Sequence, residues 1–343
     1  KFVAHPRGAS ILGAPPFETG DNMGDARAFR LTRKMENAPL AATRTARQRK
    51  LTLKEYASAY GFLGLWLIGV LAFFLWPFAH SIYLAFTNYS FEATYEFVGL
   101  DNFRTIFTDS VSLKSMSVTL RFAVMSVPLR LSFALFVAVL LNRGLSGLGI
   151  YRTIFYIPSL IGHGVAVAIM WRQMFSDQGL VSNFLHLLVG LPAKDWIHSP
   201  DSALFMLVLL SVWQFGSSML IFLAALKQVP FEMYEQAEID GASRWRQFWR
   251  ITLPLISPVV FFNLTMNIIN AFRMFTQAKV ITNGGPINET LMMVLHVYNN
   301  AFGFGKMGFA SALSWTLLMM IAAVTAVNFL VSKYWVYYET KVD

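Results

Sequence analysis

Six long apolar stretches constrain this chain more than any other feature of its sequence. Each is about as long as the roughly 20 residues that a helix needs to cross a bilayer. Each is continuously apolar, without the in-and-out alternation of barrel strands, and lipid tolerates no open sheet edge. The sequence therefore predicts an all-α, polytopic membrane protein with six transmembrane helices. The predicted spans are residues 59–79, 120–141, 154–175, 203–226, 255–275 and 309–331.

The composition of the chain agrees with lipid as its solvent. Hydrophobic residues make up 55% of the chain and charged residues only 14%, whereas about 25% of the residues in soluble domains are charged. The absence of cysteine excludes disulfides, thiolate metal sites and cysteine nucleophiles. The net charge of +9 is typical of the Lys and Arg that collect on the cytoplasmic flanks of spans, so no nucleic-acid partner is expected.

Basic residues set the expected orientation. The tail at residues 1–55, the link at 142–152 and the segment at 227–250 all carry Lys and Arg, and they fall on one side of a six-span bundle. By the positive-inside rule that side is the cytoplasm, and an even number of spans returns residues 338–343 there. The sequence thus predicts a membrane domain over residues 56–337 between two cytoplasmic tails.

The cytoplasmic loop at residues 227–258 is long and amphipathic, unlike the other loops of the chain. Pro230 suits a helix start, Glu232 the positive end of the helix dipole, and Gly241 the helix end. Aromatic residues then recur at helical spacing among three arginines, which indicates a second amphipathic element near the membrane surface. This pattern fits equally well a helix that docks on a soluble partner and a helix that lies against the bilayer.

The same loop resembles the signature loop of the permeases of binding-protein-dependent importers. The pattern of that family is Glu-Ala-Ala, three residues, Gly, nine residues, Ile, one residue and Leu-Pro. With Gln in place of the first alanine, it is filled here by Glu235, Gln236, Ala237, Gly241, Ile251, Leu253 and Pro254. Stretches at residues 97–103, 151–160 and 281–290 resemble the sugar branch of the family, the maltose-type permeases.

This resemblance implies an importer of the bacterial inner membrane that is built from several subunits. Its parts are two homologous permeases, forming a heterodimer, two ATP-binding subunits and an extracytoplasmic sugar-binding protein. The chain would be a non-catalytic permease with no cofactor of its own, while the partner ATPase subunits use ATP and Mg. A sugar or oligosaccharide would cross by alternating access, and the loop helix would be the coupling helix seated in a cleft of the ATPase.

The resemblance assigns specific roles to two loops. The predicted coupling residues are Glu235, Gln236, Ala237, Asp240, Gly241, Ala242, Arg244, Ile251, Leu253 and Pro254. On the opposite side, the turn formed by Asn283, Gly284, Gly285 and Pro286 is expected to meet the binding protein or to gate access. A plain surface turn is the competing interpretation of this second loop.

Polar residues in the spans indicate where substrate passes. Asn263, Asn267 and Asn270 recur at i, i+4 and i+7 on one helical face, and Arg273 lies about one turn beyond them. Amide and guanidinium groups suit sugar hydroxyls and carboxylates, although asparagines also form hydrogen bonds between helices. Arg130 in the second span joins this predicted pathway. Together with Arg273 and Lys279 it raises the hypothesis of an anionic cargo such as a uronic-acid oligosaccharide, but a structural pair with an acidic group explains Arg130 equally well.

Other functions fit the sequence less well. No P-loop of the form GxxxxGK[ST] is present, so the energy of ATP has to come from another chain. An ion-coupled secondary transporter of a polar solute is the alternative, but such carriers commonly use buried carboxylates, and none lies in the middle of a span. The six histidines are scattered and no HExxH or GxSxG pattern occurs, so neither a catalytic nor a metal site is predicted.

Overall fold

The computed structural model describes residue 56 and residues 58–91, 95–142, 147–189 and 195–337. The chain divides into two compact units, Lys1–Trp76 and Pro77–Asp343, and each is described by itself. The predicted tails at residues 1–55 and 338–343 lie outside the described residues. In the described part of the chain every regular element is a helix, apart from one β-bridge between Thr87 and Phe97, in agreement with the all-α prediction.

Three helices are long and apolar enough to cross a membrane on their own. They are the helix Ser58–Ala85, which includes η1 (Leu71–Leu75) and α3 (Trp76–Ala85), together with α5 (Ser110–Leu141) and α16 (Met307–Trp335). At about 1.5 Å of rise per residue, each exceeds the roughly 30 Å of a hydrocarbon core. They contain the first, second and sixth predicted spans.

The third and fourth predicted spans are pairs of helices that bend at a short break, and a similar break lies at the start of the fifth, at residues 255–275. α6 (Leu148–Ile161) meets α7 (Val165–Met174) at 97°, α9 (Pro200–Trp213) meets α10 (Gly216–Leu226) at 43°, and Arg244–Leu255 meets α14 (Ser257–Phe272) at 68°. By length and composition, the described residues therefore provide up to six spans. Residues 154–175 and 203–226, expected as single helices, are each divided.

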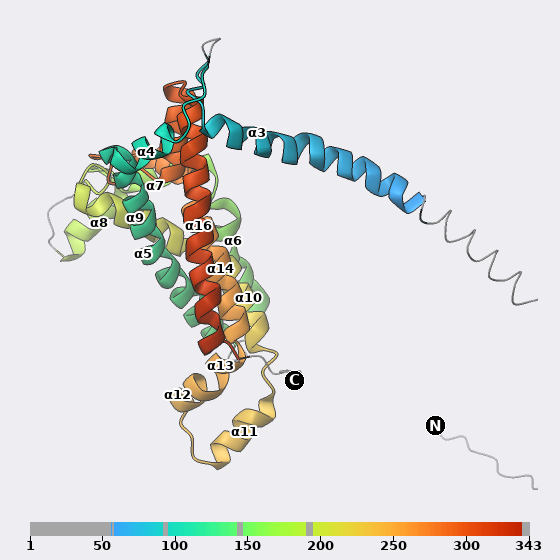
Figure 1. Ribbon diagram of the computed structural model, residues 1–343. Coiled ribbons are helices and arrows are strands. Elements are labelled where there is room, and N and C mark those ends of the chain that lie inside the picture. The colour runs from blue at the N-terminus through green and yellow to red at the C-terminus, as the bar shows by residue number, and fades with distance from the viewer. Residues whose placement is uncertain (1–55, 57, 92–94, 143–146, 190–194, 338–343) are drawn as a thin grey trace, which may run out of the picture. The chain divides into compact units, whose positions relative to one another are not determined.

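Short helices lie at the two ends of the bundle. Figure 1 shows α4 and α8 at one end and α11, α12 and α13 at the other. We call these the outer end and the inner end, after the orientation expected from the sequence. The short helices are α4 (Asp101–Thr108), α8 (Leu180–Val189), α11 (Phe231–Ile239), α12 (Arg244–Gln247), η2 (Phe248–Thr252), α13 (Leu253–Leu255), η3 (Ala278–Thr282), α15 (Met293–Tyr298) and η4 (Asn299–Gly303).

The helix α5 forms the centre of the bundle. It packs against α9, α10 and α14, and large side chains fill the space between these helices. Phe122 of α5, Phe222 of α10 and Phe272 of α14 are each at most 1% exposed. This packing holds the broken spans around one side of α5, where a polar cavity is found.

Candidate functional site

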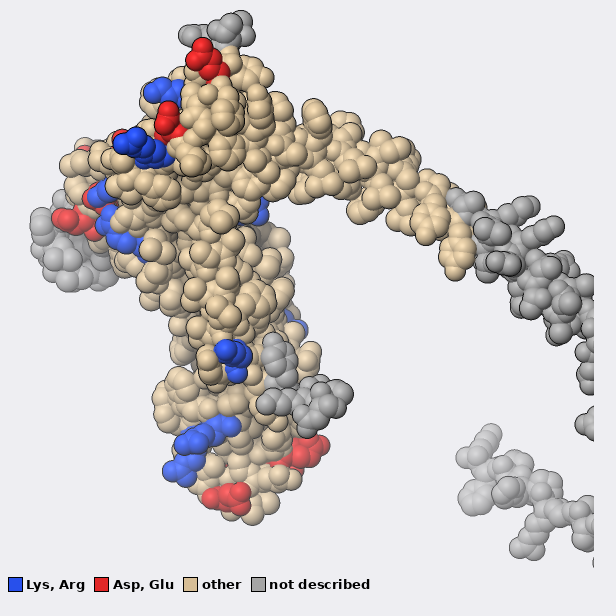
Figure 2. All heavy atoms as spheres, viewed as in Figure 1, with Lys and Arg blue, Asp and Glu red and all other residues tan. Residues whose placement is uncertain are grey.

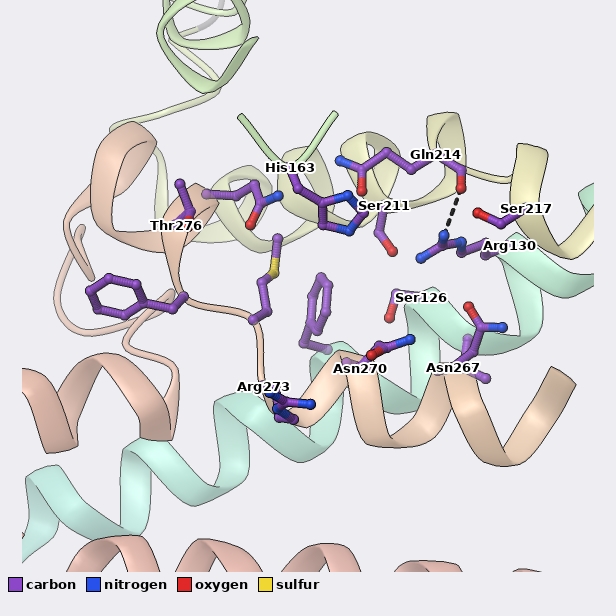
Figure 3. Close-up of a pocket in the computed structure, with 16 residues that line it drawn as sticks. Ser126, Arg130, His163, Ser211, Gln214, Ser217, Asn267, Asn270, Arg273 and Thr276 are labelled. Carbon is purple, nitrogen blue, oxygen red and sulfur yellow. Dashed lines mark hydrogen bonds between the residues drawn. The ribbon is translucent and has the colours of Figure 1, made fainter. Parts of the chain in front are cut away.

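A polar cavity of about 460 Å³ opens between α5, α14 and the two helix breaks at Gly162 and Gln214 (Figure 3). Its side chains are mostly amides, hydroxyls and cations, which are costly in contact with lipid. The lining residues are Phe122, Ser126, Val127, Arg130, His163, Ser211, Gln214, Ser217, Asn267, Asn270, Ala271, Arg273, Met274, Phe275, Thr276 and Gln277.

Four of the five predicted pathway residues line this cavity. Two of them, Asn267 and Asn270, lie on α14, and Arg273 is the residue directly after this helix. The fourth, Arg130, lies on α5. Asn263 does not line the cavity; it is 2% exposed, and its carbonyl accepts a hydrogen bond of 2.8 Å from Asn267 Nδ2. The same Asn267 nitrogen lies 3.1 Å from Ser218 Oγ on α10, so this asparagine also serves helix packing.

The two helix breaks are joined to each other by hydrogen bonds. Gln214 Nε2 donates to the Gly162 carbonyl at 2.9 Å, and Gln277 Nε2 donates to the same oxygen at 3.3 Å. Gly162 has no room for a side chain, because a Cβ there would lie 2.5 Å from both Gln214 Cγ and the Pro158 carbonyl. A carbonyl released by a broken helix needs such a partner inside a membrane.

The backbone carbonyl of Gln214, at the break between α9 and α10, is also hydrogen-bonded. It accepts hydrogen bonds from Arg130 Nη2 at 2.6 Å and from Ser159 Oγ at 2.9 Å. Among the described residues, Arg130 therefore pairs with backbone and not with an acidic side chain. Its guanidinium fixes the α9–α10 break and lines the cavity at the same time (Figure 3).

The charges of the cavity lining have one sign. Arg130, Arg273 and His163 contribute cationic or titratable groups, and no Asp or Glu is among the lining residues. Arg273 is exposed, and no hydrogen bond or ion pair of its side chain is recorded among the described residues, whereas Arg130 is partly buried and bound to Gln214. The cavity thus offers one guanidinium that is open to a ligand, at Arg273, and one that is bound through Nη2 while its Nε is buried without a hydrogen-bond partner, at Arg130.

Several lining residues were missed as pathway residues by the sequence reasoning. Ser126, Gln214 and Gln277 are polar groups within or beside apolar spans, which is the signal that could have found them. His163 also lies within a predicted span, at residues 154–175, and was not predicted as a pathway residue. It sits directly after the break at Gly162 and points into the cavity (Figure 3).

The inner loop has the two helical elements that its sequence predicts. The first, α11, ends where Gly241 takes a φ of +73°, and the Ala242 amide donates to the Ala237 carbonyl at 2.8 Å. Tyr234 Oη and Thr252 Oγ1 lie 2.9 Å apart and join α11 to η2. Figure 2 shows acidic side chains gathered over α11 and basic ones over α12.

The predicted coupling residues are distributed over both elements of this loop. Glu235, Gln236 and Ala237 lie in α11, Asp240 caps it, and Arg244 begins α12. Ile251, Leu253 and Pro254 follow in η2 and α13, close to the 68° bend into α14. No residue of α11 is buried, although Tyr234 and Ala237 are partly covered.

The predicted outer turn is tightly folded. Asn283 and Gly284 both have positive φ, at 48° and 86°, and the peptide between Gly285 and Pro286 is cis. Thr290 Oγ1 donates to the Gly285 carbonyl at 2.6 Å and closes the turn. The neighbouring Glu289 pairs with Lys114 and with Arg121, both on α5. The turn therefore sits on a segment that is fastened to the bundle.

Known proteins resemble the chain over most of its length. Residues 122–342 match the family described as "Binding-protein-dependent transport system inner membrane component". The probable ABC transporter permease protein YesP of Bacillus subtilis strain 168 is 47% identical over 292 residues, which cover 84% of this chain and 94% of YesP. The sn-glycerol-3-phosphate transport system permease protein UgpA of Pectobacterium atrosepticum is 34% identical over 263 residues, covering 75% of this chain and 88% of UgpA.

A solved structure has the same fold. It is a bacterial ABC transporter involved in the import of the acidic polysaccharide alginate, matched with a TM-score of 0.72 and 21% identity over 83% of this chain and 98% of the matched one. The expected resemblance to importer permeases is thereby confirmed. Because the family match spans more than half of its residues, the chain belongs to the inner membrane components of binding-protein-dependent transport systems, the permease subunits of ABC importers.

Proposed function

We propose that this permease carries an acidic sugar or oligosaccharide across the inner membrane through the polar cavity. The observation that carries the proposal is the lining of that cavity, which combines sugar-binding amides and hydroxyls with cations and includes no carboxylate. Hydroxyl-rich cargo matches the amides, and a carboxylate matches a guanidinium in geometry as well as charge. The cation open to the cargo is Arg273, because Arg130 is engaged by Gln214.

The relatives support a sugar-type, anionic cargo. UgpA belongs by its name to a transport system for sn-glycerol 3-phosphate, a phosphorylated polyol, and the permease of similar fold to one for alginate, an acidic polysaccharide. The alternative of an ion-coupled secondary carrier has no support from the family match.

Energy enters, in this proposal, through α11. Its surface is exposed and acidic, and the small residues Ala237, Gly241 and Ala242 allow a partner to approach the backbone closely. These features suit a cleft on a partner ATPase subunit that uses ATP and Mg. The bond between Tyr234 and Thr252 makes α11 and η2 move together. Movement of α11 would then reach α14, which carries Asn267 and Asn270 into the cavity.

The remaining partners of the proposed assembly follow from the family. A second, homologous permease completes the transmembrane pathway, and two ATPase subunits bind at the inner end. An extracytoplasmic binding protein delivers cargo at the outer end, where the turn from Asn283 to Pro286 is the proposed contact. The fastening of its neighbour Glu289 to α5 supports this role, since a fixed turn offers a defined docking surface.

The test is uptake by the reconstituted transporter with Arg273→Gln in this chain. We expect uptake of a uronic-acid trisaccharide to fall by about tenfold to a hundredfold, because a hydrogen bond to a charged group contributes about 1.5–3 kcal/mol. Uptake of a neutral trisaccharide should change little. Wild type and variant are compared with the same binding protein, so any preference of that protein cancels.

The matched control is Arg172→Gln, in the last turn of α7 and outside the cavity lining. It removes one arginine from the chain without altering the cavity. Equal transport of acidic and neutral sugars by the wild type, or equal losses from the two substitutions, would reject an acidic cargo recognised at Arg273.

A further inference from the structure

A second cavity, of about 620 Å³, lies at the inner end of the bundle. Its walls come from the last turns of α5, the end of α10, and the loop elements α11, α12 and η2. The volume is within the range of about 300–1,000 Å³ that is usual for small-molecule sites. Most of the wall is apolar, formed by Leu135, Phe136, Val139, Leu226, Phe231 and Phe248.

Three arginines lie along the part of the loop that forms one wall of this cavity. Arg244 lines it, and Arg246 and Arg250 follow within six residues, all three being exposed. None of the salt bridges between described residues involves these arginines. Glu238 also lines the cavity but lies outside salt-bridge distance of Arg244. The three guanidinium groups are therefore available to an anion.

Two tryptophans of the same loop are exposed, and one of them, Trp245, also lines the cavity. Trp245 is 72% exposed and Trp249 is 49% exposed, and their ring centroids lie 5.6 Å apart in an edge-to-face arrangement. Indole rings prefer the boundary between lipid and water, and basic residues beside them favour a surface with anionic lipids. The charge and aromatic character of this loop thus point to the inner leaflet of the bilayer.

We propose that this cavity binds an anionic phospholipid of the inner leaflet. An acyl chain occupies the apolar interior beside Leu135 and Val139, and the headgroup phosphate binds the arginines of α12 and η2, with Arg244 nearest the cavity. Guanidinium groups bind phosphate through two parallel hydrogen bonds. This site goes beyond the proposed transport function, which requires no lipid ligand. The lipid would fill the gap between the loop and α5 and so brace α11 against the bundle.

The test measures which lipid stays bound to the full chain in detergent. Native mass spectrometry is carried out after addition of equal amounts of dioleoylphosphatidylglycerol and dioleoylphosphatidylcholine. We expect the wild type to retain the anionic lipid about tenfold more than the zwitterionic one. Arg244→Gln should reduce this preference severalfold, and Val139→Trp, which fills the cavity, should reduce the retention of both lipids.

Matched controls separate a built site from general attraction. Arg172→Gln removes an arginine elsewhere, and Val124→Trp adds the same bulk at a position of α5 that is 65% exposed. Both should behave as the wild type. The milder Leu135→Phe tests the cavity again if Val139→Trp fails to fold, as judged by helicity and gel filtration.

Three results would overturn the proposal. The first is equal retention of the two lipids by the wild type. The second is undiminished retention by a folded cavity-filling variant, which would leave only a charged surface for headgroups. The third is loss of the anionic lipid, with protection of α12 from hydrogen exchange, when the ATPase subunits bind, because the surface would then belong to the ATPase.

Discussion

The loops at the two ends of the bundle are held in different ways. At the outer end, the segment at residues 277–306 is bound to α5, and its helix α15 buries Met293, Leu295 and His296. At the inner end, α11 buries no residue. The hydrogen bonds of the inner loop join parts of the loop to each other, as between Tyr234 and Thr252 and between Gln247 and the Ala242 carbonyl.

This difference separates a segment that is fastened to the bundle from a loop that, in the proposed function, transmits movement. The outer segment contacts α5 through buried groups, so it moves with the bundle. The inner loop is stiff within itself but touches the core little, so it can be displaced as one body by a partner. The predictions that follow test this contrast, beginning with the largest expected effect.

The largest effect is expected for Gly241→Val at the end of α11. A β-branched residue is strained at the φ of +73°, by about 1–3 kcal/mol, and the loop relieves this strain by changing its direction. We expect cargo-stimulated ATPase activity of the reconstituted transporter to fall by at least about tenfold, since small misplacements of a docking face have effects of this size. The membrane domain itself should remain folded.

Gly147→Val is the control for backbone strain. Gly147 has a φ of +77° and, like Gly241, nothing within 4 Å of the position that a Cβ would take. The same strain is thus introduced outside the loop. A comparable loss of stimulated activity in both variants would show that strain alone is responsible, and the mobile role of the inner loop would be rejected.

The fixed outer segment should lose stability on Thr119→Val. Thr119 Oγ1 accepts a hydrogen bond of 2.8 Å from the Met293 amide in a buried position. Valine has the same shape but leaves this amide without a partner, which costs about 1–3 kcal/mol. Thermal unfolding in detergent should move to lower temperature, while Thr108→Val, at an exposed helix position, should change it little. Equal melting of both variants would contradict a tightly held outer segment.

The outer segment is also expected to weaken in acid. Burial lowers the pKa of His296, and the Asp109 carboxylate opposes this only in part. Burial alone would raise the pKa of Asp109, but hydrogen bonds from Ser112 hold it below its usual value, so Asp109 stays charged as His296 titrates. Unfolded chains then bind more protons than folded ones below about pH 6.5, and stability falls as pH falls from there.

The measurement is thermal unfolding at about pH 7.5 and about pH 5.5, for the wild type and for His296→Gln. The variant has no imidazole to protonate, so the pH dependence between these values should become smaller. The glutamine amide can still bond Ser112, whose Oγ lies 3.1 Å from His296 Nε2. An unchanged pH dependence would assign the acid sensitivity to other groups.

The smallest effect is expected for Glu289→Gln. Its pairs with Lys114 and Arg121 are partly exposed to solvent, with 21–47% of the three side chains accessible. Such pairs contribute at most about 1 kcal/mol, so a small loss of thermal stability is expected, and it should shrink further in high salt. A loss as large as that of Thr119→Val would show that charge, rather than buried contact, fastens the outer segment.

Hydropathy was sufficient to predict the apolar helical stretches that are long enough to cross a membrane, singly or as bent pairs. The breaks inside the spans could not be predicted in the same way, because they depend on partners distant in the sequence. Gln214 and Gly162 are 52 residues apart, and only the packed bundle brings the amide to the free carbonyl. Ser112 and His296 are 184 residues apart, and their contact could not be predicted from the sequence for the same reason.

The candidate site was predicted in part for a related reason. Helical spacing placed Asn263, Asn267 and Asn270 on one face of α14, and the structure agrees with that spacing. Spacing does not tell how far along the face a cavity extends, so Asn263 is buried in packing while Asn270 is exposed in the cavity. The motif of the inner loop predicted its two helical elements well because turns and caps are local.

The unequal engagement of the two arginines in the polar cavity has an evolutionary consequence. A descendant of this permease that replaced Arg130 would lose one of the two hydrogen bonds to the Gln214 carbonyl and so weaken the α9–α10 break as well as change the cavity. Arg273 has no such structural partner among the described residues, so a single substitution there can change the charge preference of the cavity. Divergence of cargo among close relatives should therefore begin at the position of Arg273.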